Sequence, residues 1–338
     1  MMAKILSIRD IANELNISKT TISFILNGKA KEKRISDELD ESVTKYLAQR
    51  DYKPNQLAKS LIMGKTMMIG LMVENISYYF FAQVAYHIEE LAYQNGYRII
   101  YCISDNDLHK TQELIGMFRE RHVDGYIITP PSGIEKDIKG LLDDGLPVVL
   151  FDRYLEGVDT SYVVLDNYKA SYDAAKYLTS KGFKNIAFLE LDSDQSQMHD
   201  RRQVYQDALA ESNLPLSIKK IPFISDFDYK VKEMVKFIKK NQQIDAVFFA
   251  TNYLAFSGIK AINELKMSTH KDLALVAFDD HEVFNIYSPS ITAVAQPIRK
   301  LARQSINAFL KMLDADGRSN NAEKIEVPAE LMIRYSTG

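Results

Sequence analysis

Polar and aromatic residues directly follow several short apolar runs of this 338-residue chain, and this placement suits the binding of a small molecule. Apolar runs such as 148–151 and 273–278 have the character of buried strands. In an open parallel sheet, ligands bind beyond the carboxyl ends of the strands. The residues at those positions are Asn75 to Phe81, Ser104, Asp105, Asp152, Arg153, Asp192, Asn252, Asp279 and Asp280.

The elements that must position these residues form an α/β pattern from about residue 66 onward. Strand-like runs alternate with amphipathic helical segments, which predicts parallel sheets covered by helices on both faces. This number of strands fits two sheets of about six strands better than one sheet, so we expect a core of two similar halves. The predicted strands are 67–73, 98–104, 126–129, 148–151, 162–165, 186–191, 246–250 and 273–278.

Residues 6–28 have the pattern of two short capped helices joined by a tight turn, a helix-turn-helix. Ser7 is the expected N-cap of the first helix, with Asp10 three residues on, and Ser18 caps the second. Asn16, in the turn, tolerates a left-handed backbone. At helical spacing, Ile22, Ile25 and Leu26 fall on one face of the second helix, and Thr20, Ser23, Phe24 and Asn27 fall on the opposite face.

The second helix of a DNA-binding helix-turn-helix enters the major groove, where its first residues reach base edges. Thr20, Thr21, Phe24 and Asn27 are therefore the candidate readers. Lys19 is expected nearer the core side, with a side chain long enough to reach a phosphate. The alternative is a helical hairpin that only packs, since capped helix pairs are common.

Two further helical segments follow. Ser36 is the expected cap of a third helix, whose apolar residues could close a small core with the first two. Pro54 suits the first turn of a short helix that ends at Gly64. About nine residues is below the length of roughly 12 to 15 at which isolated helices become marginal, so we expect this segment to fold only against a partner.

Composition limits the classes of protein to consider. The net charge is -3, yet residues 1–65 hold 12 Lys or Arg against 8 Asp or Glu. This modest basic excess suits phosphate binding, with two copies acting better than one. Cys102 is the only cysteine, which excludes an intrachain disulfide framework and a cysteine-based zinc cluster. No apolar run has the length of a signal peptide or of a membrane span, so we expect a cytoplasmic protein.

With its helix-turn-helix, short helix and two-part α/β core in this order along the chain, the sequence resembles the LacI/GalR family, the lactose-repressor and galactose-repressor family of bacterial transcription regulators. The resemblance is strongest in SIRDIANELNISKTTISFILNG, YKPNQLAKSL, VVLDNYKASYDAAKYLTSKGFKNIAFLE, VAFDDHEVF and PSITAVAQP. It implies a repressor that binds a near-palindromic operator as a homodimer, with a core that resembles periplasmic sugar-binding proteins and binds a small effector. The implied domains are a headpiece (1–53), a hinge helix and linker (54–65), and a core (66–338) with an N-subdomain (about 66–165 and 296–324) and a C-subdomain (about 166–295 and 325–338).

The resemblance also implies DNA-binding residues outside the second helix. Asn55, Ala58 and Leu61 match the family's hinge helix, whose leucine is levered into the minor groove; alternatively, Leu61 is an ordinary apolar linker residue. Phe24 departs from the family, in which many members carry an arginine that pairs with guanine. A phenylalanine offers only apolar contact, for instance with a thymine methyl, or it packs against the third helix. The full DNA-binding set is Ser7, Lys19, Thr20, Thr21, Phe24, Asn27, Asn55, Ala58 and Leu61.

For the effector, the resemblance points to the polar residues at the strand ends. Val204 stands where the family usually has glycine, so Arg202 is an alternative to Arg201. Carboxylate, guanidinium and amide groups beside an aromatic wall suit a sugar or sugar derivative, whose hydroxyls donate and accept hydrogen bonds. Each residue could instead form a structural ion pair or a cap. The expected effector-binding residues are Tyr78, Phe80, Asp152, Arg153, Arg201, Asn252, Asp279 and Gln296.

Two other functions compete with a regulator. An α/β enzyme is possible because the fold does not decide function, but the dinucleotide glycine fingerprint, the G-x-S-x-G elbow and the H-E-x-x-H motif are absent from the sequence. A cytoplasmic solute-binding protein without a DNA role would have no use for the helix-turn-helix. We therefore expect no catalytic residues, no cofactor and no metal.

Overall fold

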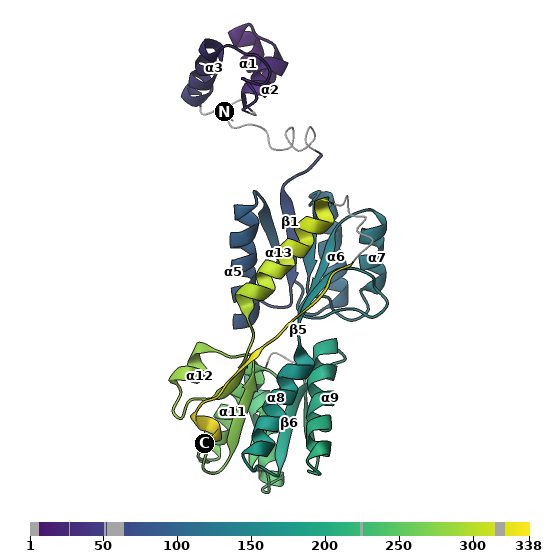
Figure 1. Ribbon diagram of the computed structural model, residues 1–338, viewed down its shortest axis with the longest axis vertical. Coiled ribbons are helices and arrows are strands. Elements are labelled where there is room, and N and C mark those ends of the chain that lie inside the picture. Colours follow the sequence, from purple (N-terminus) through teal and green to yellow (C-terminus); the bar gives the residue numbers. More distant parts are fainter. Residues whose placement is uncertain (1–6, 27, 51, 53–63, 224–225, 315–321) are drawn as a thin grey trace. The chain divides into compact units, whose positions relative to one another are not determined.

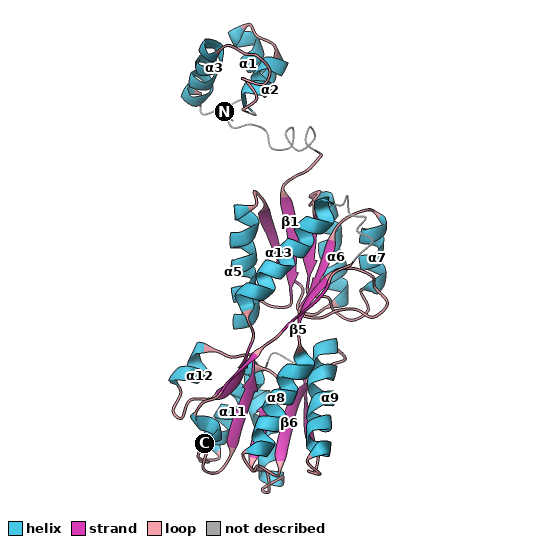
Figure 2. Ribbon diagram, in the orientation of Figure 1, coloured by secondary structure: helices cyan, strands magenta, loops and turns pink. Residues whose placement is uncertain are grey.

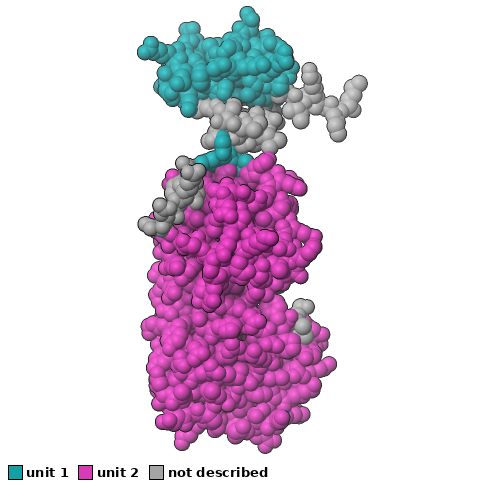
Figure 3. Space-filling model, turned by 90° about the vertical axis from the view of Figure 1, so that its right-hand side faces the viewer, with its two compact units in different colours: residues 1–67 teal, residues 68–338 magenta. Residues whose placement is uncertain are grey.

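The computed structural model describes residues 7–26, 28–50, 52, 64–223, 226–314 and 322–338. The chain forms two compact units, residues 1–67 and 68–338, which Figure 3 shows in teal and magenta. Their boundary lies within two residues of the junction expected between linker and core. Residues 53–63, which hold most of the predicted hinge helix, lie outside the described residues.

The first unit contains α1 (Ile8–Leu15), α2 (Lys19–Leu26) and α3 (Asp37–Gln49). The predicted caps are confirmed: Ser7 and Asp10 form a reciprocal capping box, and Ser18 Oγ accepts a hydrogen bond from the backbone N–H of Thr21 at 3.0 Å. Asn16 adopts the left-handed conformation, with φ 52°. The three helices enclose one small core, made by Ile11, Ala12, Ile22, Ile25, Ala30, Val43 and Leu47.

The second unit contains two six-stranded sheets, as expected (Figures 1 and 2). The first sheet has the order β11-β5-β4-β3-β1-β2, and all its strands are parallel. Its helices are α5 (Tyr79–Gln94), α6 (Leu108–Glu120), α7 (Glu135–Asp143) and α13 (Ile298–Asp314). Its strands are β1 (Met68–Val73), β2 (Arg98–Ile103), β3 (Gly125–Ile128), β4 (Val148–Phe151), β5 (Tyr162–Leu165) and β11 (Lys324–Val327).

The second sheet has the order β12-β10-β9-β8-β6-β7. Its edge strand β12 pairs antiparallel with β10, so the expectation of wholly parallel sheets is wrong at this edge. Its helices are α8 (Asn167–Ser180), α9 (Ser196–Glu211), α10 (Phe227–Lys240), α11 (Asn252–Glu264), α12 (Glu282–Ile286) and the 3-10 helix η1 (Tyr335–Thr337). Its strands are β6 (Ile186–Asp192), β7 (Ser217–Pro222), β8 (Ala246–Phe249), β9 (Ala274–Phe278), β10 (Thr292–Ala295) and β12 (Glu330–Met332).

The chain passes between the sheets at three points: after β5, after β10 and after β11. Because β11 pairs with β5, residues 324–327 belong to the N-subdomain sheet, and the expected boundary at 324–325 is three residues early. The pairing, which sequence periodicity does not reveal, decides this boundary. The third crossover instead lies between Val327 and Glu330.

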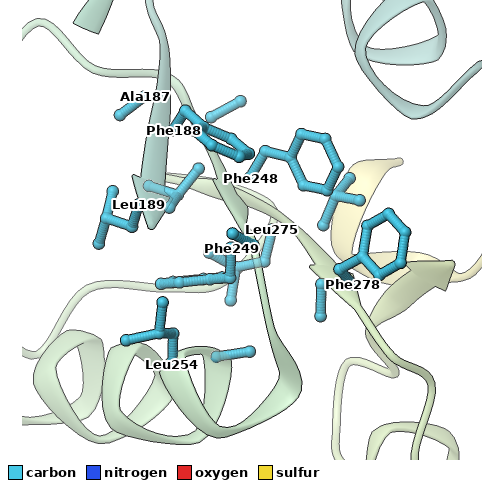
Figure 4. Close-up of a cluster of buried hydrophobic side chains, with 14 of the residues drawn as sticks. Ala187, Phe188, Leu189, Phe248, Phe249, Leu254, Leu275 and Phe278 are labelled. Carbon is cyan, nitrogen blue, oxygen red and sulfur yellow. The ribbon is translucent and has the colours of Figure 1, made fainter. Parts of the chain in front are cut away.

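Continuous apolar strands build the core of the C-subdomain. In Figure 4, the aromatic rings of Phe188, Phe248 and Phe278 lie near one another around the sheet, and Leu254 projects from a helix toward the same cluster. All four of these side chains are fully buried. Burying large aromatic side chains on both sides of a central strand stabilises the sheet, and it fixes the ends of β8 and β9, where candidate ligand residues begin.

Candidate functional site

All eight expected effector-binding residues line one small cavity in the second unit, to which both subdomains contribute. Its volume is about 40 Å³. Two of its carboxylate residues follow strands directly, Asp152 after β4 and Asp279 after β9, and both have a left-handed backbone, with φ 71° and 67°. Aspartate tolerates this conformation better than most residues. The strand ends therefore place both carboxylates at the cavity.

A buried ion-pair network forms the N-subdomain side of the cavity. The Arg153 guanidinium donates to Glu74 at 2.6 Å, to Asp152 at 3.0 Å and to Asn106 at 3.1 Å. The side chains of Arg153 and Glu74 are only 4% and 5% exposed. A buried charge is tolerated only where it is paired and hydrogen-bonded. This network therefore holds Asp152 and Arg153 in fixed positions at the cavity.

Arg201 occupies the C-subdomain side. It donates to the side chain of Asn167 at 2.9 Å and to the carbonyl of Ala250 at 2.7 Å, and its guanidinium carbon lies 3.5 Å from the centroid of the Phe278 ring. Asp279 lies 3.8 Å from Arg201 and accepts a short hydrogen bond from Gln296. Burial raises the pKa of Asp279, and the Arg201 charge opposes that rise.

The neighbouring Arg202 points elsewhere. Its guanidinium donates to Glu190 at 3.0 Å and does not line the cavity. Of the two arginines that the sequence leaves open, the structure thus brings only Arg201 to the candidate site.

Two tyrosines close the cavity from opposite subdomains. Tyr78, the N-cap residue of α5, stacks on Tyr253 of α11 with ring centroids 4.7 Å apart and planes 15° apart. Behind this pair, the ammonium of the buried Lys230 lies 5.7 Å from the Tyr253 ring centroid. Phe80 stacks in turn on Phe151. Because the rings span the cleft, the two subdomains are in contact across it.

Two polar atoms at the cavity lack partners within the described part of the chain: Nε2 of Gln195, a donor, and Oε1 of Gln197, an acceptor. Both residues are about 5% exposed. An unpartnered buried polar atom is costly. A ligand hydroxyl, which both donates and accepts hydrogen bonds, can bond to either atom.

Five residues that line the cavity were not expected from the sequence. Glu74 directly follows β1 and Tyr253 follows Asn252, so a window one residue wider would have included both. Three others lie at the start of α9, several residues beyond the end of β6, and carry no comparable signal. Conversely, Asp105, just beyond β2, and Asp192, the last residue of β6, pair with Lys110 and Lys220 away from the cavity. The five missed residues are Glu74, Gln195, Gln197, Met198 and Tyr253.

A larger cavity of about 450 Å³ shares Phe80, Asp279 and Gln296 with the first. Its other walls include the Asp280–Arg334 ion pair, with Nη2 and Oδ2 2.7 Å apart, and His281. Burial lowers the pKa of His281. Since only three of the eight expected residues border this cavity, we assign the smaller one as the candidate effector site.

The headpiece presents a polar face beside its core. Lys19 and Thr20 are exposed at the start of α2. The hydroxyl of Thr21 contacts that of Ser18 at 2.8 Å, and Ser7 is engaged in the cap of α1. Phe24 is half-buried but lies outside the headpiece core. Four other expected DNA-binding residues lie outside the described residues: Asn27, Asn55, Ala58 and Leu61.

Neither a membrane segment nor a metal site is found in the part of the chain that the structure describes. None of its helices is long and apolar enough to cross a bilayer. Within the same residues, no group of three or more His, Cys, Asp or Glu side chains is arranged to hold a metal ion.

Comparison with known proteins identifies relatives along the whole chain. Residues 7–55 match the model for bacterial regulatory proteins of the lacI family, and residues 175–337 match that for a periplasmic binding protein-like domain. The HTH-type transcriptional regulator RegA of Clostridium saccharobutylicum is 30% identical over 315 residues, which are 91% of this chain and 92% of RegA.

Two solved structures are similar in fold. The lac repressor dimer bound to operator and the anti-inducer ONPF is 18% identical, with a TM-score of 0.87 over 99% of each chain. A LacI family transcriptional regulator from Enterococcus faecium with bound ribose is 23% identical, with a TM-score of 0.71 over 80% of this chain and 98% of that one.

Proposed function

Since this chain belongs to the LacI family of bacterial regulatory proteins, we propose that it is a repressor whose headpiece binds operator DNA and whose cleft binds a small effector. The effector is a sugar or sugar derivative, and the active form is a homodimer on a near-palindromic operator. In this function the protein is not an enzyme, and it acts in the cytoplasm. The convergence of eight predicted residues on one cavity carries the proposal.

The geometry of α2 supports DNA binding. Ile22 and Ile25 are buried in the headpiece core, so the helix presents its opposite face, with Lys19 and Thr20 exposed at its first turn. The first residues of such a helix are the ones that reach base edges. The headpiece is small and only modestly basic, which favours two headpieces acting together on two half-sites. The solved dimer of the lac repressor bound to operator has the same fold.

The chemistry of the cleft supports a polyhydroxylated effector. The free donor of Gln195 and the free acceptor of Gln197 suit hydroxyl groups, which serve both roles. Tyr253 offers an aromatic face against which the CH groups of a sugar ring can pack. Asp152, Arg201 and Asn252 add charged and amide groups around them. The ribose bound to the Enterococcus faecium regulator is a ligand of this class.

Binding must be coupled to a change in the cleft. A volume of about 40 Å³ holds about one water molecule, whereas small-molecule sites span roughly 300–1,000 Å³. The effector therefore enters only when the two subdomains separate and Tyr78 leaves Tyr253. A ligand that binds only the separated state shifts the population toward it, and the changed angle between subdomains alters the spacing of the two hinge segments.

For the hinge, we assign residues 54–65, with Asn55, Ala58 and Leu61 contacting DNA. An apolar side chain wedged into the minor groove unstacks a base step at a cost of a few kcal/mol. The bent DNA then contacts more of the protein surface, and these added contacts must offset that cost. Replacing Leu61 with Ala should therefore weaken operator binding far more than nonspecific binding. An unchanged ratio of the two affinities in a gel-shift titration would remove the wedge role.

The effector site is tested by a thermal-shift screen of sugars and sugar phosphates with the full-length protein. A ligand at 100 times its dissociation constant adds about 2.7 kcal/mol of stability. The adjacent arginines provide a matched pair of variants: Arg201→Lys should abolish the shift caused by an active sugar, and Arg202→Lys should retain it. Equal effects of both variants, or no shift with any carbohydrate, would contradict the assignment.

The DNA function is tested by selecting binding sites from a randomised duplex library with the full-length protein. The expected product is a near-palindrome, bound with an affinity that falls steeply as salt rises. A solute-binding protein without a DNA role would select no sequence and show no such salt dependence. If neither selection nor salt dependence is observed, the repressor function is refuted and the solute-binding alternative is supported.

A further inference from the structure

Phe24, a large residue on the outward face of α2, carries no hydrogen-bonding group in its side chain. It is half-buried and lies outside the headpiece core that Ile22 and Ile25 help to form. An aromatic hydrocarbon ring cannot accept from or donate to a base edge. A reading group at this position must therefore come from another part of the headpiece.

The segment that follows α2 is an ordered basic loop (residues 28–35). The N–H of Lys29 donates to the carbonyl of Phe24 at 2.8 Å, which ties the start of the loop to the helix. Ala30 is buried in the headpiece core, and its carbonyl accepts from the N–H of Ile35 at 2.9 Å. The N–H of Lys33 donates to the carbonyl of Lys29 at 3.0 Å. These bonds fix the position of Lys33 relative to Phe24.

The side chain of Lys33 extends over the face of the Phe24 ring, with Nζ 5.6 Å from the ring centroid. The negative face of an aromatic ring attracts an ammonium at this distance. Lys33 also contacts Glu32 at 2.8 Å, and both of these side chains are well exposed, at 40% and 60%. Such an exposed pair is weak, so Lys33 can exchange the carboxylate for an acceptor on DNA while its ammonium stays over the Phe24 ring.

We propose that Lys33 is a base-reading residue, held at the outward face of α2 by Phe24, and that it donates to O6 and N7 of a guanine in each operator half-site. Lysine and arginine are the side chains that recognise these two acceptors in the major groove. Phe24 acts as the positioning residue, and the pair replaces a single long reading side chain on the helix. This inference rests on the proposed binding of operator DNA by α2.

The test is selection from a randomised duplex library with the full-length protein and four variants. The wild type should select guanine at one symmetric pair of positions. Lys33→Ala should lower the preference for guanine over the other bases about tenfold at that pair of positions and nowhere else. Lys33→Arg should retain this preference. Phe24→Ala should weaken the same preference, because the ring no longer holds the ammonium. Lys31→Ala, an exposed lysine of the same loop, should lower affinity for all sequences alike.

Three results would overturn the inference. One is an unchanged sequence preference for Lys33→Ala. Another is a uniform loss of affinity for Lys33→Ala that matches Lys31→Ala, which would make Lys33 a phosphate contact. The third is failure of the wild type to select any sequence, which would instead refute the DNA-binding function on which the inference rests. Lys33 is a surface residue, and circular dichroism of Lys33→Ala should show the helix content of the wild type.

Discussion

Removing Arg153 should destabilise the second unit much more than removing its partner Glu74. Without the guanidinium, as in Arg153→Met, the carboxylates of Glu74 and Asp152 face each other with no cation between them, in a region where Glu74 is only 5% exposed. Breaking a buried pair in this way costs about 3–5 kcal/mol. In Glu74→Gln, Arg153 keeps Asp152 and Asn106 and gains a neutral acceptor, so the cost is about 1–2 kcal/mol.

Urea denaturation of the full-length protein, followed by far-ultraviolet circular dichroism, measures both free energies of unfolding. Lys169→Met is the matched control, because it breaks the exposed Lys169–Asp173 pair on the same unit and should leave stability unchanged within error. The double variant Glu74→Gln/Arg153→Met should cost less than the sum of the single changes, since the second removes the charge that the first exposes. Equal costs for the two single variants, or strict additivity, would refute this account of the network.

Three further predictions follow from buried groups. Burial raises the pKa of the Glu190 carboxyl, and the hydrogen bond and charge of Arg202 oppose that rise. The protonated carboxyl therefore stabilises the folded state at pH values below the unfolded pKa, and this stabilisation is lost as pH rises through the folded pKa. Glu190→Gln should accordingly gain stability relative to wild type between pH 4 and 7 in urea titrations, and a pH-independent difference would contradict the shift. Gly258→Ala would place a Cβ 2.2 Å from a ring carbon of Phe249 and should destabilise the protein by about 1–3 kcal/mol. Gly116→Ala, on α6, meets open space and should stabilise the protein by about 0.5–1 kcal/mol. Melting temperatures that shift in the same direction for both variants would contradict this reasoning. Tyr78→Ala should remove the stack on Tyr253, which is worth about 0.5–1.5 kcal/mol. Hydrogen exchange of the backbone amides at the start of α11 should therefore become about two- to tenfold faster. Unchanged exchange rates would mean that the stack does not hold the cleft closed.

The sequence predicted those parts of the fold whose signals are local. Ser7, Asn16 and Ser18 cap and connect the two helices of the helix-turn-helix through groups that lie within three or four residues of one another. The central strands of both sheets, such as β4 and β8, are buried over their whole length and appear as uninterrupted apolar runs. The end of each such strand then indicated a position for a ligand-binding residue.

Four strands at or near sheet edges gave no such signal, although the edge strand β2 was predicted. β7 and β11 are edge strands with only one buried residue each, so polar side chains interrupt their apolar pattern. The short strand β10 pairs in parallel with β9 and antiparallel with β12, whereas β12 is a strand only through its pairing with β10. Pairing, and not composition, therefore set the boundary between the two subdomains at the end of β11.

By itself, the sequence determined a helix-turn-helix, a two-sheet α/β core and polar residues at the strand ends, because backbone preferences and nearby side chains specify these features. Only the tertiary structure distinguished Arg201 from Arg202, since adjacent residues on a helix point about 100° apart and packing alone decides which faces the cleft. It also decided that Tyr78 meets Tyr253 and that Lys33 covers Phe24. Such contacts join residues from different elements, and their geometry exists only once those elements have packed.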